Sequence, residues 1–211
     1  MQQYARLAAL AVLLLYQTRL ASPYNSNPYI WPLDPWEINR LQITAPAPGQ
    51  SGSIDIDLAI SNPNTVSAGP APHAAGSGYI PFTPSAANCT ASAVSGADAL
   101  TEATCAETTE FSYGVFAVDG AITDPRSFGL AFSLNYNVSR WGGVMYKVYD
   151  ATAHLEVGQD LADGVCDGAS GTCEYELLAG STPILVQPTM TDCKGYCQMP
   201  PASANTGACS A

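Results

Sequence analysis

The stretch "SIDIDLAI", residues 53–60, indicates the fold more directly than any other part of the sequence. Aliphatic and small or acidic residues alternate along it: Ile54, Ile56, Leu58 and Ile60 lie between Ser53, Asp55, Asp57 and Ala59. Because successive side chains of a strand point to opposite faces, the aliphatic set faces a core and both aspartates face outward. We predict a half-buried antiparallel strand with Asp55 and Asp57 on its solvated face. A carboxylate pair for metal or acid–base chemistry is the alternative.

Segments of similar character lie on both sides of this stretch, with clusters of Gly, Pro, Asn and Asp between them. They span residues 38–45, 110–118, 127–138, 143–157, 173–179 and 183–188. The stretch "GADALTEATC" (96–105) has room for one helical turn, but no long segment shows a period of about 3.6 residues. Many short strands separated by turns predict an all-β fold, an antiparallel β-sandwich or barrel stapled by disulfides.

The beginning of the chain resembles an export signal. Arg6 precedes an uncharged apolar run from Leu7 to Tyr16, which is well short of the ~20 residues that span a bilayer. A core helix is the alternative, but a polar, proline-broken sequence follows at once. We therefore expect a signal peptide over 1–21 and release to the extracellular space or cell wall, without a membrane partner.

The remainder fits one domain with extensions. We assign a Pro- and aromatic-rich N-terminal segment to 22–35, the β-domain to 36–188 and a cysteine-containing tail to 189–211. Residues 61–88 form a long connection rich in Pro, Gly, Ala and Ser, and such connections are typically functional or disordered. The chain has 18 acidic and 7 basic residues, and this balance argues against nucleic acid or anionic lipid as a partner.

Seven cysteines are present, and export makes structural disulfides the default. We expect local pairs at Cys89–Cys105 and Cys166–Cys173, each across a Gly- or Ala-rich excursion between strands. In the tail we pair Cys193 with Cys197, with Cys209 as competitor and as the cysteine left over. Metal binding is the alternative, but the spacings do not match those of zinc sites.

Two sequons have the form N-x-[ST]: "NCT" at Asn88 and "NVS" at Asn137. Both Asn88 and Asn137 are predicted glycosylation sites. Asn137 lies at a strand-to-turn junction, whereas at Asn88 a disulfide through the adjacent Cys89 could compete with glycan transfer.

The sequence offers little evidence of catalysis. It lacks a nucleophile elbow, an H-E-x-x-H motif and a phosphate-binding loop, so no catalytic, cofactor-binding or metal residue is assigned and no cofactor is expected. His73 is isolated in the long connection. His154 belongs to a polar stripe that could bind a ligand but more often marks a wet sheet face: Asp150, Thr152, His154 and Glu156. The acids of the 160–167 loop could suggest calcium, but their spacing differs from that of an EF-hand: Asp160, Asp163 and Asp167.

The order "WEINRLQIT", "SIDIDLAISNPN", "NCTASAV…TCAETTEFSYGVF" and "FGLAFSLNY…YKVYDATAHLEV" resembles the small secreted fungal proteins typified by the Alternaria major allergen. The resemblance covers residues 36–187 and includes an early tryptophan, Trp36, and a Cys89–Cys105 segment before alternating aromatics. It implies a cysteine-bearing β-barrel or sandwich in a secreted setting, and no functional residue is transferred. The seven cysteines, the 61–88 connection and the tail depart from the pattern.

Two functions remain. The first is a non-enzymatic extracellular protein, effector- or allergen-like, that contacts a host protein or a cell-wall polysaccharide. The second is a carbohydrate-binding module or hydrolase, in which Trp31, Trp36 and Trp141 would stack on sugar rings. A row of exposed aromatic rings would favour the second function, and buried rings would favour the first.

Overall fold

A computed structural model describes residues 33–70, 79–94, 99–109, 113–140, 143–194 and 208–209. All regular structure in these ranges is β-strand. The strands are β1 (Trp36–Pro46), β2 (Ser53–Asn62), β3 (Val66–Pro70), β4 (Tyr79–Phe82), β5 (Ser85–Val94), β6 (Thr101–Glu107), β7 (Gly114–Ala121), β8 (Ser127–Arg140), β9 (Gly143–Glu156), β10 (Val165–Asp167), β11 (Thr172–Glu176), β12 (Ile184–Val186), β13 (Thr189–Lys194) and β14 (Ala208–Cys209).

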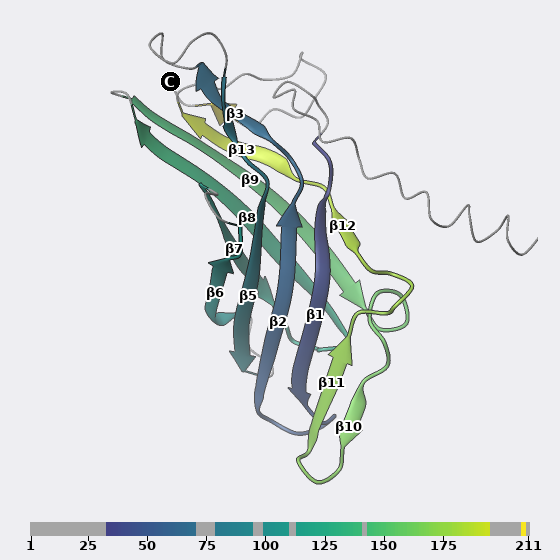
Figure 1. Cartoon of the computed structure of the whole chain (residues 1–211). Helices are drawn as coiled ribbons and strands as arrows, with labels where there is room; N and C mark the ends of the chain where they lie inside the picture. Colours follow the sequence, from purple (N-terminus) through teal and green to yellow (C-terminus); the bar gives the residue numbers. More distant parts are fainter. Residues whose placement is uncertain are drawn as a thin grey trace, which may run out of the picture.

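The strands form two principal sheets that face each other (Figure 1). The front sheet has the order β10-β11-β1-β2-β5-β6, with β12 also paired to β1. The back sheet has the order β14-β13-β9-β8-β7, and β3 pairs with β4 in a separate hairpin. Every pairing is antiparallel except that of β13 with β14, among the residues the structure describes. The predicted all-β fold with antiparallel sheets is therefore confirmed, as an open sandwich.

The core lies between the sheets and follows from the period of two in each strand. In β2 the residues Ile54, Ile56, Leu58 and Ile60 are at most 2 % exposed. The facing residues of the back sheet come mainly from β8: Phe128, Leu130, Phe132, Leu134 and Tyr136. Trp36 of β1 meets the edge of Phe116 of β7 at 5.3 Å between ring centroids, so one aromatic pair joins the two layers.

The described parts of the long connection 61–88 are mostly β-strand, which the sequence did not predict. The connection contains β3, β4 and the first residues of β5, although 71–78, with His73, lie outside the described residues. Lys147 of β9 is only 4 % exposed, and its ammonium group donates a hydrogen bond to the Ser67 carbonyl at 2.7 Å. This contact ties β3 to the back sheet.

Three further segments differ from expectation. Of the stretch 96–105, considered for a helical turn, residues 101–105 belong to strand β6, which pairs with β5, and residues 96–98 lie outside the described residues. Strand β5 itself was not predicted, since its inward residues are mainly small: Ala87, Cys89, Ala91 and Ala93. Within the tail, Thr189–Lys194 forms β13 and pairs with β9 in the back sheet. No helix suited to crossing a bilayer is found where the chain is described.

Candidate functional site

The outer face of the front sheet carries two rows of polar side chains. Register across β11, β1, β2 and β5 places one row at Glu176, Gln42, Asp57 and Thr90. The second row, two residues along each strand, is Glu174, Thr44, Asp55 and Ser92. Neighbouring strands lie about 4.8 Å apart and i, i+2 residues about 6.7 Å apart, so these rows form a grid on one face.

A hollow of about 470 Å³ lies over this grid, and we call it the polar hollow. It is lined by Gln42, Thr44, Asp55, Ile56, Asp57, Thr90, Ala91 and Ser92. Six of these eight side chains are polar, and the other two, Ile56 and Ala91, belong to the core side of the sheet. The predicted outward aspartates are thus brought together with amide and hydroxyl groups from two neighbouring strands.

The charge of the polar hollow is negative. Arg40 forms an ion pair with Asp57 at 2.7 Å, with both side chains about half exposed at 49 % and 45 %. Exposed pairs of this kind contribute only about 0–1 kcal/mol to stability. Asp55 accepts a hydrogen bond from the Ser53 hydroxyl at 3.0 Å and has no cationic partner in the described part of the chain. Ligand groups that donate hydrogen bonds or carry positive charge therefore suit this surface.

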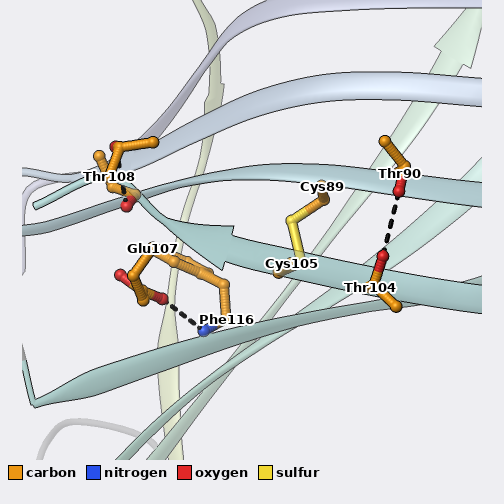
Figure 2. Close-up of a disulfide and its surroundings, with 8 residues drawn as sticks. Cys89, Thr90, Thr104, Cys105, Glu107, Thr108 and Phe116 are labelled. Carbon is orange, nitrogen blue, oxygen red and sulfur yellow. Dashed lines mark hydrogen bonds between the residues drawn. A yellow bond between two sulfur atoms is a disulfide. The ribbon is translucent and has the colours of Figure 1, made fainter.

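The polar hollow also retains hydrogen-bonding capacity. Thr90 is engaged with Thr104 at 3.1 Å between hydroxyl oxygens (Figure 2). The side chains of Gln42 and Thr44, in contrast, form no hydrogen bond within the described ranges. An amide and a hydroxyl are therefore available to a ligand at the β1 side.

A second set of polar side chains is buried near β6, the edge strand of the front sheet, where the chain crosses to β7 of the back sheet. We call it the buried polar cluster: Asn62, Ser85, Glu107 and Tyr136. The Glu107 carboxylate accepts a hydrogen bond from the Phe116 backbone N–H at 3.0 Å, so it links the two sheets (Figure 2). The Asn62 amide donates to the Tyr136 hydroxyl at 2.8 Å.

Burial governs the acidity of this cluster. It raises the pKa of Glu107 above its usual value, and the hydrogen bond from Phe116 only partly offsets this. Burial likewise raises the pKa of Tyr136 to about 12, although the nearby Ser85 and Asn62 side chains lower it. Ser85 lies beside the phenol but without good hydrogen-bond geometry, so its Oγ and the Glu107 Oε2 have no partner among the described residues. The arrangement fits an internal structural network, because Asn62, Ser85 and Tyr136 are at most 2 % exposed.

The polar stripe on β9 lies on the outer face of the back sheet, as predicted. Thr152, His154 and Glu156 are exposed. His154 Nε2 is 3.4 Å from the Ser127 hydroxyl, and Asp150 accepts a hydrogen bond from the Thr191 hydroxyl at 2.7 Å. Asp150 and His154 thus contact different neighbours and do not form an acid–histidine relay for proton transfer.

The acids of the 160–167 loop support turns. Asp160 accepts from the Glu156 N–H at 3.2 Å. Asp167 accepts from the N–H groups of Ala169 and Ser170, and the bond from Ala169 is the main reason that the pKa of Asp167 is lowered. Among the described residues no group of three or more His, Cys, Asp or Glu is arranged to hold a metal ion.

The cysteines form staples across neighbouring strands. Cys89 of β5 is bonded to Cys105 of β6 (Figure 2), and Cys166 of β10 to Cys173 of β11. The stretch 166–173 is thus the clipped turn of a hairpin. Cys193 of β13 is also disulfide-bonded, and its register partner in β14 is Cys209. Cys197, the partner expected from the sequence, lies outside the described residues.

The aromatic residues that the structure describes belong mainly to the core. Trp36, Phe82, Tyr136 and Tyr149 are at most 2 % exposed, and Tyr136 stacks on Phe82 at 4.6 Å between ring centroids. Trp31 and Trp141 lie outside the described residues. Within the described ranges no row of exposed rings lines the polar hollow.

Sequence reasoning placed Asp55 and Asp57 outward but missed their polar neighbours. Gln42 and Thr44 alternate with Leu41 and Ile43, so the same period of two could have placed them. No sequence pattern predicted the buried polar cluster, because its members come from four strands that are distant in sequence. Both predicted sequon asparagines, Asn88 and Asn137, are exposed.

The fold and site define a disulfide-stapled, all-β protein with a polar hollow on one sheet. No family model, no curated protein and no solved structure matches the chain.

Proposed function

We propose that this chain is a secreted, glycosylated, non-catalytic binding protein, and that the polar hollow is its ligand surface. The observation that carries the proposal is a hollow of about 470 Å³ on the outward face of a sheet held by covalent staples. Sites on rigid strands position polar groups without a large ordering cost on binding. Disulfides are typical of exported proteins and support this setting.

The chemistry of the polar hollow favours a cationic polypeptide, such as a basic segment of a host protein, over a neutral wall polysaccharide. Asp55 contributes negative charge, the charge of Asp57 is partly offset by Arg40, and Glu174 and Glu176 extend the acidic surface across β1. Sugar recognition commonly stacks an aromatic ring on the pyranose, whereas most described rings lie in the core and none lines the polar hollow. Electrostatic complementarity of this kind accelerates association and depends on salt.

Carbohydrate hydrolysis is not favoured by the described residues. The carboxyl group whose pKa is raised, Glu107, lies at the inter-sheet edge and is bonded to backbone. The acids of the polar hollow lie on a different face of the front sheet, so the two do not form a flanking pair of the kind that glycosidases use. We also propose a fungal origin, which the resemblance to the Alternaria allergen family implies.

The test is a binding experiment with the secreted chain on an array of basic peptides, neutral peptides and neutral wall glycans. The charge-removing pair Asp55→Asn/Asp57→Asn is compared with Asp119→Asn/Glu156→Gln on the back sheet. We expect retention on basic peptides that weakens about thirtyfold in the first pair, because its two lost contacts are worth about 1 kcal/mol each, and that also weakens with added salt. The control pair should bind as the native chain does. Binding to neutral glycans that is indifferent to Asp55 and Asp57 would refute the proposal.

A further inference from the structure

Asn88 occupies an unusual place on the front sheet. Its register partners are Ala59 on β2 and Ala106 on β6, and Ala86 lies two residues before it on β5. These three residues, which we call the alanine platform, face outward with Asn88 because register partners and i, i+2 residues share a face. An exposed asparagine is thus surrounded on three sides by methyl groups, whereas the neighbouring row of this face carries polar side chains such as Asp57 and Thr90.

The side chains of the three residues in the Asn88 sequon point to different faces of β5. Asn88 and Thr90 point outward, whereas Cys89 is 1 % exposed and forms its disulfide with Cys105 inside the sandwich (Figure 2). A sugar on Asn88 and the disulfide therefore occupy opposite sides of the strand. In the folded chain they do not compete for space.

The second sequon has different surroundings. Asn137 is exposed on the back sheet, and its register partner is Tyr146, whose hydroxyl donates a hydrogen bond to Asp192 at 3.0 Å. Asn137 therefore has the large side chain of Tyr146 beside it, whereas Asn88 has only alanines beside it. The two sequons therefore provide a matched comparison on opposite faces of one molecule.

We propose that Asn88 carries an N-linked glycan whose first N-acetylglucosamine lies on the alanine platform and screens the adjacent side of the polar hollow. This inference rests on the proposed export of the chain. The donor is a polyprenyl-pyrophosphate-linked oligosaccharide. The bond between its sugar C1 and the pyrophosphate oxygen breaks, a bond from C1 to Asn88 Nδ2 forms, the amide loses one proton, and the polyprenyl pyrophosphate leaves.

The register places this sugar next to the ligand surface. Thr90 follows Asn88 by two residues, about 6.7 Å along the same strand, and lines the polar hollow. Asp57 is the register partner of Thr90. A glycan on Asn88 thus borders the hollow at the Thr90–Asp57 side and leaves the Asp55–Ser92 side open, so a ligand chain enters from that side.

The experiment uses the full chain exported from a eukaryotic secretory host, with Asn88→Gln, Asn137→Gln and Thr90→Ser as variants. Glycopeptide mass spectrometry gives the occupancy of each sequon. Carbodiimide labelling of carboxylates, measured by peptide mapping, then reports the access to Asp57 and Asp55, with the exposed Asp163 as reference. We expect Asn88 to be glycosylated in the native and Thr90→Ser chains. In Asn88→Gln one glycan mass should be lost and labelling of Asp57 should rise relative to Asp163, whereas Asn137→Gln should leave Asp57 unchanged.

The outcomes separate this inference from the proposed function. An exported chain with Asn88 unoccupied would overturn the glycan, whether or not Asn137 is used, and would leave the binding proposal intact. Occupied Asn88 with the same labelling of Asp57 in native and Asn88→Gln chains would overturn the screening. A chain retained in the cell would refute export, and glycopeptide mapping of the retained chain would still decide whether Asn88 carries a glycan.

Discussion

Removal of the core disulfide by Cys89→Ala/Cys105→Ala should destabilise the whole sandwich. Cys89 is 1 % exposed and belongs to the core cluster, and the bond joins two neighbouring strands of the front sheet. The sequence separation of 16 closes a loop of 17 residues. On the chain-entropy model such a loop removes about 3 kcal/mol of unfolded-state freedom. Lost packing around the buried Cys89 and the partly buried Cys105 adds about 1 kcal/mol.

A total of about 4 kcal/mol is a large part of the roughly 5–15 kcal/mol by which domains are stable. For a domain of this size it corresponds to a decrease in Tm of about 8–16 °C. The assay is urea unfolding under non-reducing conditions, followed by the fluorescence of the buried Trp36 and checked by calorimetry.

The matched control is Cys166→Ala/Cys173→Ala. Its loop of 8 residues, from a sequence separation of 7, gives about 2.5 kcal/mol on the same model. The β10–β11 hairpin lies at the lower end of the front sheet, and all three residues of β10 are exposed (Figure 1). Without its staple the exposed strand β10 can loosen in the folded state too, which lowers the loss, whereas Cys173 on β11 is 0 % exposed and its truncation loses some packing; the measured loss should therefore stay near the entropic figure and below that of the core pair. Equal losses for the two pairs, or an unchanged midpoint in the core pair, would refute the reasoning.

Three further predictions concern the buried polar cluster and its surroundings. Because the pKa of Glu107 is raised on folding, the folded chain binds a proton more tightly, and the free energy of unfolding should fall as pH rises from about 4.5. Glu107→Gln should flatten this slope in urea titrations between about pH 4 and 7, and parallel curves would contradict it. Tyr136→Phe should cost about 1–3 kcal/mol because it leaves the Asn62 amide unpaired; a stability equal to that of the native chain would contradict this. Gly114→Ala places a methyl group 2.8 Å from the Tyr136 ring and should cost about 1–3 kcal/mol in thermal unfolding, whereas Gly168→Ala, with open space around it, should be close to neutral.

The period of two predicted most of the strands that bury large aliphatic or aromatic residues. Strand β2 was expected at 53–60 and spans Ser53–Asn62, and β8 was expected at 127–138 and spans Ser127–Arg140. Strands β5 and β6 were not predicted from the sequence, because their alanine, cysteine and threonine residues give little hydrophobic contrast between the two faces of a strand. They are strands because β5 pairs with β2 and β6 pairs with β5, and no local sequence pattern records these backbone hydrogen bonds.

In the candidate site, too, some features follow from local alternation and others only from the pairing of strands. Alternation alone directs Asp55 and Asp57 outward, and in principle Gln42 and Thr44 as well. Which of these side chains share a row depends on the register between β1, β2 and β5, which joins residues up to about forty positions apart. Register is set by the core face and by the turns, so a slip of one residue would turn the aspartates inward and dismantle the polar hollow.

The sequence by itself determined the all-β class, the outward aspartates and the local disulfides, because each depends on neighbours close along the chain. Only the tertiary structure decided that β6 crosses to β7, where Glu107 links the sheets, and that Asn88 stands among alanines from three strands. These features depend on contacts between segments far apart in sequence. Such contacts form when the two sheets close on a common core, and the free energy that selects them comes from the burial of both faces together.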